Sequence, residues 1–163
     1  MNARTLTLET RKAALSDATA MSRLTLQLGY DCTEVMMRQR LVRLRDDPDH
    51  AVFVASLDGG EVVGWVHLEL RKPLWCDPFV EIVGLVVSAT HRRIGIGRAL
   101  ADRAIAWGQS LRIADVRARA QAHREDALSF YEGLGFELFK EHQVYRWVEG
   151  DAPDVNGSPT IIE

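Results

Sequence analysis

The chain has 163 residues, of which 47% are hydrophobic and 26% charged, and its net charge is −3. At roughly 100–200 residues per domain this length predicts one domain, and the composition excludes a disordered chain. The longest uncharged apolar stretch, residues 82–90, is far shorter than the about 20 residues of a membrane helix. The N-terminus lacks an apolar run of the signal-peptide type, and the net charge gives no reason to expect a nucleic-acid partner.

The possible functions are limited further by the two cysteines and by the uneven distribution of charge. Cys32 and Cys76 lie far apart, without a CxxC motif or a nearby Cys/His cluster. We therefore expect no metal site, no disulfide framework and a reducing, cytoplasmic location. Residues 149–163 contain four acids and no Lys or Arg, so we expect one domain over 1–148 and an acidic, loosely ordered tail over 149–163. Residues 91–124 contain eight arginines against two aspartates, an excess that favours a compact anionic ligand.

Hydrophobic periodicity predicts the order β-α-α-β-β-β-α-β-α-β(β), a mixed α/β fold with a central mixed sheet flanked by helices. The expected strands cover residues 5–12, 51–56, 61–70, 79–88, 113–120 and 136–148, the last as one or two strands. The expected helices lie between residues 16 and 29, 33 and 46, 98 and 108, and 125 and 134. An Asp58-Gly59 turn between apolar runs predicts a hairpin. The β-branched run over 79–88 indicates a central strand buried on both faces.

A turn rich in arginine and glycine connects this central strand to the next helix. The first turn of a helix leaves N–H groups unpaired and carries partial positive charge. Gly95 and Gly97 have no Cβ, so an anion can approach the backbone closely. Arg92, Arg93 and Arg98 add charge-assisted donors around the same point. These features together predict a pyrophosphate cradle.

Two motifs indicate which pyrophosphate the cradle holds. A dinucleotide-binding GxGxxG would need glycine at Leu100, and no GKS or GKT of a Walker loop is present. The turn instead reads R-x-x-G-x-G from Arg92 to Gly97, and A-x-x-F-Y-E-x-L-G-F follows from Ala127 to Phe136. These motifs and the element order resemble the GNAT superfamily of N-acetyltransferases, over roughly residues 6–148. The resemblance implies a single GNAT-like domain and acetyl-CoA as co-substrate.

The resemblance also implies which residues hold acetyl-CoA. The amides of residues 93–97, with Arg98 at the helix start and Arg92 beside them, are expected to hold the pyrophosphate. The backbone of residues 85–87 is expected to pair with the pantetheine arm where the central strand and the next strand splay apart. The implied cofactor-binding residues are Leu85, Val86, Val87, Arg92, Arg93, Ile94, Gly95, Ile96, Gly97, Arg98 and Arg124. At the position of Arg124 many members carry Asn, so the sequence departs from the family pattern there.

Acetyl transfer to an amine needs a proton acceptor, an oxyanion donor and, for the thiolate, a proton donor. Glu81 is a carboxylate in an apolar strand, and it matches the position of the catalytic glutamate in the histone-acetyltransferase branch. The alternative is a strand glutamate paired with an arginine. The resemblance implies that Tyr131 protonates or orients the sulfur, the alternative being a core tyrosine. It also implies that the Leu85 amide faces the oxyanion.

A candidate acceptor pocket lies on another strand. Counting by two places His67 and Glu69 on one strand face with Val63 and Trp65. Three interpretations are open for His67 and Glu69. They line an acceptor pocket, they face solvent, or they make a hydrogen bond within the core.

The function that fits best is transfer of the acetyl group of acetyl-CoA to a primary amine. We expect direct attack in a ternary complex, because no cysteine lies in the active-site segments. The acceptor is expected to be a small molecule, with no nucleic-acid and no membrane partner. The alternatives are a non-catalytic acyl-CoA-binding or sensor domain, and a generic interaction domain. Because members of this superfamily often dimerise through late strands, the resemblance also implies a homodimer.

Overall fold

A five-stranded sheet runs through the middle of the molecule in the strand order β1-β2-β3-β4-β5. The structure is a computed structural model, and it describes residues 5–120 and 125–149. The strands are β1 (Leu8–Lys12), β2 (His50–Leu57), β3 (Glu61–Arg71), β4 (Phe79–Val87) and β5 (Val116–Ala118). Neighbouring strands are antiparallel except β4 and β5, which are parallel, so the sheet is mixed as predicted.

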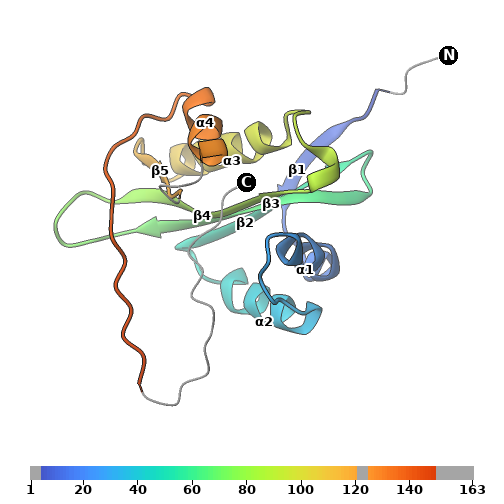
Figure 1. The fold of residues 1–163 in the computed structure, drawn as a ribbon, viewed down its shortest axis with the longest axis horizontal. Helices are drawn as coiled ribbons and strands as arrows, with labels where there is room; N and C mark the ends of the chain where they lie inside the picture. Colours follow the sequence, from blue (N-terminus) through green and yellow to red (C-terminus); the bar gives the residue numbers. More distant parts are fainter. Residues whose placement is uncertain (1–4, 121–124, 150–163) are drawn as a thin grey trace.

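Helices cover both faces of this sheet. They are α1 (Ala18–Gln27), α2 (Glu34–Arg45), α3 (Ile96–Ser110) and α4 (Glu125–Gly133), with the short 3₁₀ helices η1 (Leu15–Asp17) and η2 (Ala89–His91). Helices α1 and α2 lie on one face, and α3 and α4 lie on the other (Figure 1). The structure therefore confirms the predicted fold class, a central mixed sheet between helical layers.

Local sequence signals explain where several of these elements begin and end. The hydroxyl of Thr33 accepts a hydrogen bond from the Met36 N–H and caps the start of α2. Helix α1 ends before Gly29, whose φ of +85° belongs to the left-handed region. Asp58 and Gly59 have φ values of +52° and +68°, which a tight hairpin turn between β2 and β3 requires.

The sheet separates two apolar cores. The core under α3 contains fully buried side chains from the middle of the sheet, including Leu68, Ile82 and Leu85, together with Leu100 of α3. The smaller core under α1 and α2 includes Met21, Cys32 and Val54. Burying such side chains stabilises the fold by about 1.5–3 kcal/mol each. Strand β4 is buried along almost its whole length, as the β-branched run predicted.

The C-terminal end of the sheet differs from the prediction. The closing strand or strands expected over 136–148 were wrong, because residues 137–149 form an extended segment in which the structure has no strand. We call residues 137–149 the C-terminal arm. Strand β5 is also shorter than the expected 113–120. Alternation of side chains indicates β propensity, but a strand forms only where a neighbouring strand supplies backbone partners.

Candidate active site

Strands β4 and β5 separate after a short paired stretch. Only Val80–Ile82 of β4 pairs with Val116–Ala118 of β5, whereas β4 continues to Val87 beside β3. The register between β3 and β4 also shifts next to His67, which leaves Val83 as an extra residue and bends β4. From Val83 onward, β4 has no strand on the β5 side within the described parts of the chain. This splayed edge is where the sequence placed residues 85–87.

The side chains of those three residues are not exposed toward the splayed edge. Leu85, Val86 and Val87 are 0%, 1% and 7% exposed, and Leu85 and Val87 belong to the core under α3. Only their backbone groups are therefore suited to contact a ligand. That an extended, amide-containing chain lies against this edge as an added strand stays a prediction.

The predicted cradle follows β4 directly. Arg93 and Gly95 both have left-handed backbone conformations, with φ values of +61° and +89°. Gly95 is the N-cap of α3 and supplies no side chain to cap it, so the first-turn N–H groups from Ile96 to Arg98 have no intrahelical acceptor. A Cβ at Gly95 would meet nothing within 4 Å, so this side of the turn is open. The turn therefore fits an anion that binds backbone N–H groups.

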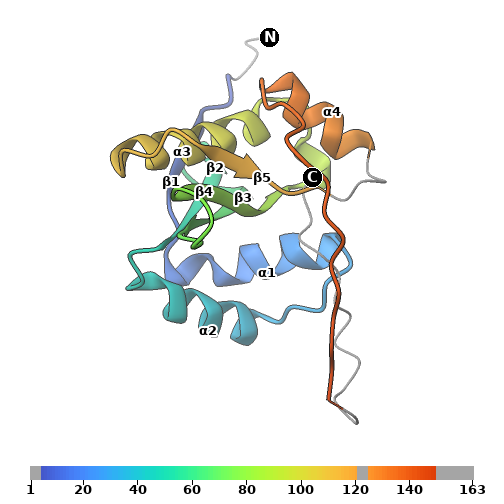
Figure 2. The same cartoon turned by 90° about the vertical axis from the view of Figure 1, so that its left-hand side faces the viewer.

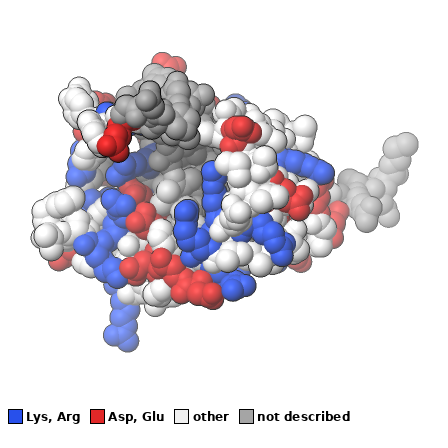
Figure 3. Space-filling model, turned by 90° about the horizontal axis from the view of Figure 1, so that it is seen from below, with Lys and Arg blue, Asp and Glu red and all other residues white. Residues whose placement is uncertain are grey.

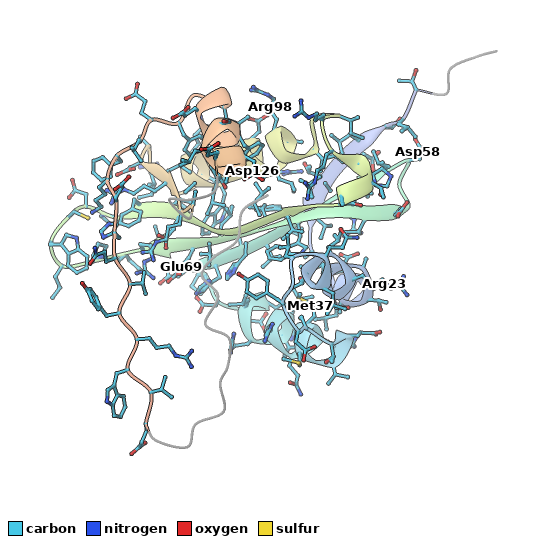
Figure 4. All side chains as sticks on the ribbon, in the orientation of Figure 1. Arg23, Met37, Asp58, Glu69, Arg98 and Asp126 are labelled. Carbon is cyan, nitrogen blue, oxygen red and sulfur yellow. The ribbon has the colours of Figure 1, made fainter. Side chains whose placement is uncertain are left out.

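The second glycine of the motif has a different role. A Cβ at Gly97 would lie 2.7 Å from the ring of Phe130, so only glycine allows α4 to pack this closely on α3. Nη2 of Arg98 also donates a hydrogen bond to the Gly133 carbonyl at 3.2 Å. Figure 4 shows Arg98 beside α4, which carries Asp126. Gly97 therefore positions α4 over the start of α3, whereas Gly95 leaves space for a ligand.

Tyr131 of α4 packs into the core beside this cradle. Its side chain is 6% exposed, and its ring makes edge contacts with Phe130 and Phe136 at centroid distances of 5.0 and 5.3 Å. Burial raises the pKa of the phenol above its ordinary value. The buried hydroxyl has no hydrogen-bond partner in the described structure. An unsatisfied buried hydroxyl costs free energy, so the Tyr131 hydroxyl is a candidate for a hydrogen bond to a polar ligand group.

Glu81 lies on the opposite face of the sheet from Tyr131. Its neighbours in β4, Val80 and Ile82, point into the core under α3, so Glu81 points to the α1 and α2 side. It is 7% exposed, and one carboxylate oxygen lies 2.7 Å from Nε of Arg119. The other lies 3.8 Å from Nε of Arg71. The pairing with arginine that was the structural alternative for Glu81 is therefore present.

Polar side chains of β3 adjoin Glu81 on the same face. Glu69 lies opposite Glu81 in the register, and Nη1 of Arg71 is 3.1 Å from its carboxylate. Figure 4 places Glu69 on the far side of the sheet from Arg98. Figure 3, which views this side of the molecule, shows acidic and basic side chains interspersed. We call Glu69, Arg71, Glu81 and Arg119 the charged floor.

A histidine pair next to the charged floor was missed by the sequence analysis. Nδ1 of His50 and Nε2 of His67 are 3.0 Å apart, and Nε2 of His50 is 3.8 Å from Asp47. Burial, with the nearby charge of His50, lowers the pKa of His67 to about 4.

Trp65 and His67 share this face as predicted, but Val63 was placed on the wrong face. It belongs to the core under α3, because the β2–β3 register shifts at Ala55 and Ser56.

Other predicted features have simple outcomes. Arg124 lies outside the described residues. None of the described helices is long and apolar enough to cross a membrane. Over the same residues, no three His, Cys, Asp or Glu side chains gather in a way that would hold a metal ion.

A mixed sheet whose strands β4 and β5 part beside an open, glycine-containing helix start is the geometry to which the comparisons with known proteins add a family. The family model described as "Acetyltransferase (GNAT) family" matches residues 19–136. The chain therefore belongs to the GNAT acetyltransferase family, which confirms the resemblance and the class of enzyme inferred from its two motifs.

Curated relatives are acetyltransferases of several kinds. The chain is 27% identical to aminoglycoside N(6′)-acetyltransferase type 1 of Stenotrophomonas maltophilia over 78% of this chain and 84% of that protein. It is 33% identical to the streptothricin acetyltransferase of Escherichia coli over 56% of this chain and 50% of that protein. A probable N-acetyltransferase family 8 member 5 of Mus musculus is 27% identical over 61% of this chain, which spans 45% of that relative.

Solved structures support the fold. The aminoglycoside N-acetyltransferase AAC(6′)-Iy in complex with CoA superposes with a TM-score of 0.79 at 18% identity, covering 90% of this chain and 99% of that one. A Trypanosoma brucei acetyltransferase superposes with a TM-score of 0.72 at 22% identity, covering 86% of this chain and all of that one. At these identities the likeness concerns the fold.

Proposed function

We propose that this chain transfers the acetyl group of acetyl-CoA to a primary amine of a small molecule, by direct attack within a ternary complex. The observation that carries the proposal is the open edge of β4 leading into the Gly95 turn, with the unpartnered Tyr131 hydroxyl beside it. An extended amide chain with a pyrophosphate at one end suits this edge and this turn chemically, because both offer backbone hydrogen-bonding groups. Acetyl-CoA has that form and carries the acetyl group to be transferred.

The backbone provides most of the proposed contacts to acetyl-CoA. N–H groups of residues 93–97 surround the pyrophosphate, with the guanidinium groups of Arg92, Arg93 and Arg98 around them. Backbone groups of Leu85, Val86 and Val87 pair with the pantetheine arm, and the Leu85 amide faces the thioester oxygen. Arg124 completes the proposed set on the strength of the sequence alone.

Two side chains are proposed to handle protons on opposite faces of the sheet. Glu81 accepts the proton of the acceptor ammonium, directly or through a water molecule. Arg119 and Arg71 fix its orientation while each carboxylate oxygen retains a lone pair. Tyr131 donates a hydrogen bond to the sulfur as the thiolate leaves. Burial favours its protonated form, so the phenol stays a donor at neutral pH.

Relatives and the charged floor support a small amine as acceptor. Two curated relatives are named for the acetylation of an aminoglycoside and of streptothricin. Glu69, whose side chain is 26% exposed, and the buried Glu81 face each other across β3 and β4 on the α1 and α2 side, and carboxylates attract an ammonium group. We also propose a cytoplasmic location, since Cys32 is a buried free thiol that a reducing compartment preserves.

The test measures binding and turnover separately. Purified chain is assayed for thiol release from acetyl-CoA against a panel of primary amines, and its melting temperature is measured with acetyl-CoA. At about 100 times Kd a ligand adds about 2.7 kcal/mol of stability. The double variant Glu81→Gln, Tyr131→Phe is expected to lose turnover while keeping this stabilisation.

The possible results separate enzyme from binding module. Stabilisation of the wild type without turnover on any amine would indicate an acyl-CoA sensor. A wild type that acetyl-CoA does not stabilise contradicts the cradle itself. Full turnover by the double variant would remove both proton-handling roles.

A further inference from the structure

The four side chains of the charged floor are unequally exposed. The side chains of Arg119 and Arg71 are 55% and 42% exposed, whereas those of Glu69 and Glu81 are only 26% and 9% exposed. The two carboxylates are therefore buried more deeply than the guanidinium groups that pair with them. Although the four formal charges cancel, a molecule that approaches the charged floor meets positive charge first.

The more exposed guanidinium keeps donors for another acceptor. The contact between Arg119 and Glu81 is made by Nε, at 2.7 Å, and not by the two terminal nitrogens of the guanidinium. These nitrogens carry four of the five N–H donors of the group. They form a planar fork whose geometry matches a carboxylate, which it binds through two parallel, charge-assisted hydrogen bonds.

Neighbouring ion pairs do not reverse this charge. Beside the floor on β5, Nη2 of Arg117 lies 2.7 Å from the carboxylate of Asp115. Next to the end of β3, Nζ of Lys72 lies 2.7 Å from the carboxylate of Asp49. Each pair is neutral as a whole, so neither adds an unpaired carboxylate that would attract a second ammonium group.

Helix α2 adds positive charge on the same side of the sheet. Helices α1 and α2 lie on the side to which the charged floor points (Figures 1 and 2). Helix α2 contains four arginines and one acidic residue, Glu34 in its first turn. Arg43 of this helix lies near the floor, because it lowers the pKa of His67 in addition to burial and the charge of His50.

This arrangement suits an acceptor that carries both charges. An amine with several ammonium groups would bring some of them against exposed guanidinium groups, and like charges repel. An acceptor with one ammonium group and one carboxylate instead meets a partner for each, Glu81 for the ammonium and Arg119 for the carboxylate. Because Glu81 and Arg119 are in direct contact, only a short spacer between the two groups of the acceptor fits.

We propose that the acceptor is an α- or β-amino acid, whose carboxylate binds Arg119 and Arg71 and whose amino group faces Glu81. This inference rests on the acetyl transfer proposed above and narrows its substrate class. The amino nitrogen forms an amide bond to the acetyl carbon while the bond from that carbon to sulfur breaks. The ammonium loses one proton to Glu81 and a second to the departing thiolate, so the products are an N-acetyl amino acid, free thiol and one proton.

The test compares acceptors that differ only in the carboxylate. Thiol release from acetyl-CoA is measured with the common α-amino acids and β-alanine, with the primary amides of the same compounds, and with a polyamine and an aminoglycoside. Losing a hydrogen-bonded charge is expected to lower kcat/KM about tenfold or more, so the best amino acid should exceed its own amide by this factor. It should also exceed both polycations.

A variant of the floor separates carboxylate binding from the orientation of Glu81. Arg119→Gln is expected to bring the ratio of kcat/KM between the amino acid and its amide close to one. A merely orienting role would lower both values together and leave the ratio unchanged. The control Arg45→Gln removes a guanidinium from the largely exposed pair with Asp46 and is expected to keep the wild-type ratio. Melting curves establish that both variants are folded.

Binding distinguishes the acceptor class from the reaction. The shift in melting temperature that each compound adds to the CoA complex is measured without turnover. Amino acids that bind while no amine is acetylated would support this acceptor site and contradict the proposed acetyl transfer. Turnover that is fastest on an amide or a polycation would overturn the amino-acid acceptor and leave acetyl transfer intact. An unchanged ratio in Arg119→Gln, or no binding and no turnover of any amino acid, would also overturn it.

Discussion

Nε of Arg119 lies 2.7 Å from the carboxylate of Glu81, which is only 7% exposed, whereas the arginine side chain is 55% exposed. A buried carboxylate is thus neutralised by a guanidinium that reaches in from the surface. Arg71 adds a second, longer contact of 3.8 Å. Because a buried charge without a partner is costly, this pair links the stability of the β4–β5 junction to the group proposed to accept a proton.

Replacing Arg119 by Gln is expected to lower the free energy of unfolding by about 1–2 kcal/mol, less than for a fully buried pair because Arg119 is half exposed. Urea denaturation of Arg119→Gln, Glu81→Gln and the double variant measures the coupling, expected to be about 1 kcal/mol. The control is Arg45→Gln, which removes a largely exposed pair with Asp46. A coupling of zero would show that the pair has no energetic role.

Gly95→Ala is expected to weaken binding of CoA about tenfold, or about 1.4 kcal/mol, because its Cβ enters the open side of the turn. The left-handed backbone adds a stability cost of about 1–2 kcal/mol. Gly59→Ala has the same backbone problem, with φ of +68° and open space around it, but lies in the β2–β3 turn. Titration calorimetry should show normal CoA affinity for Gly59→Ala. Equal losses in both variants would contradict a ligand at Gly95.

Gly97→Ala is expected to destabilise the protein by about 1–3 kcal/mol through overpacking. The added Cβ would lie 2.7 and 2.9 Å from two atoms of the Phe130 ring, which must move and take α4 with it. In the double variant Gly97→Ala, Phe130→Leu, a smaller side chain replaces the ring and makes room for the added Cβ. This variant is expected to recover part of the lost melting temperature. If the second substitution only adds to the loss, the close packing of α4 on α3 is not the reason for this glycine.

Local signals were sufficient to predict most of the elements. The Thr33 cap, the Asp58-Gly59 turn and the Gly95 helix start each depend on backbone geometry within a few residues. The burial of β4 could also be predicted from the sequence, because its β-branched residues leave the strand without a polar face. The two motifs around Gly95 and Tyr131 then identified the family. They did not show that Gly97 allows α4 to pack on α3 and that Gly95 alone leaves space for a ligand.

Features that depend on register or on a partner were not predictable. A regular hairpin that starts from the Leu57–Glu61 pair would place His67 opposite Ala51. The shift at Ala55 and Ser56 instead places it opposite Val52, two residues from His50. A one-residue shift moves side chains to the other face, which explains both the misplaced Val63 and the missed histidine pair. The closing strands over 136–148 were predicted wrongly because local β propensity does not show whether a segment pairs with a neighbouring strand, and the C-terminal arm has no strand in the structure.

Tyr131→Phe is expected to leave the unliganded protein as stable as the wild type, or up to about 1 kcal/mol more stable, since the hydroxyl is buried without a partner. The same variant is expected to lose turnover, because it cannot donate a hydrogen bond to the leaving sulfur. Melting curves test the expected stability of the unliganded variant, and thiol-release rates test the expected loss of turnover. A large loss of stability in the unliganded variant would mean that the hydroxyl has a structural partner.

His67 is expected to make the protein less stable as the pH falls from 6.5 toward 4. Burial, then the charge of His50, lowers its pKa from 6.5 to about 4 in the folded state. In this window the unfolded chain binds a proton that the folded chain does not, so protonation favours unfolding. The free energy of unfolding falls by about 3 kcal/mol in total. The whole loss is present below the folded-state pKa, and none of it is present above pH 6.5. His67→Gln cannot take up this proton, so urea denaturation at a series of pH values should show a flatter profile for it. His142→Gln removes an exposed histidine of the C-terminal arm and should keep the wild-type slope; the same slope in all three proteins would contradict a role for His67.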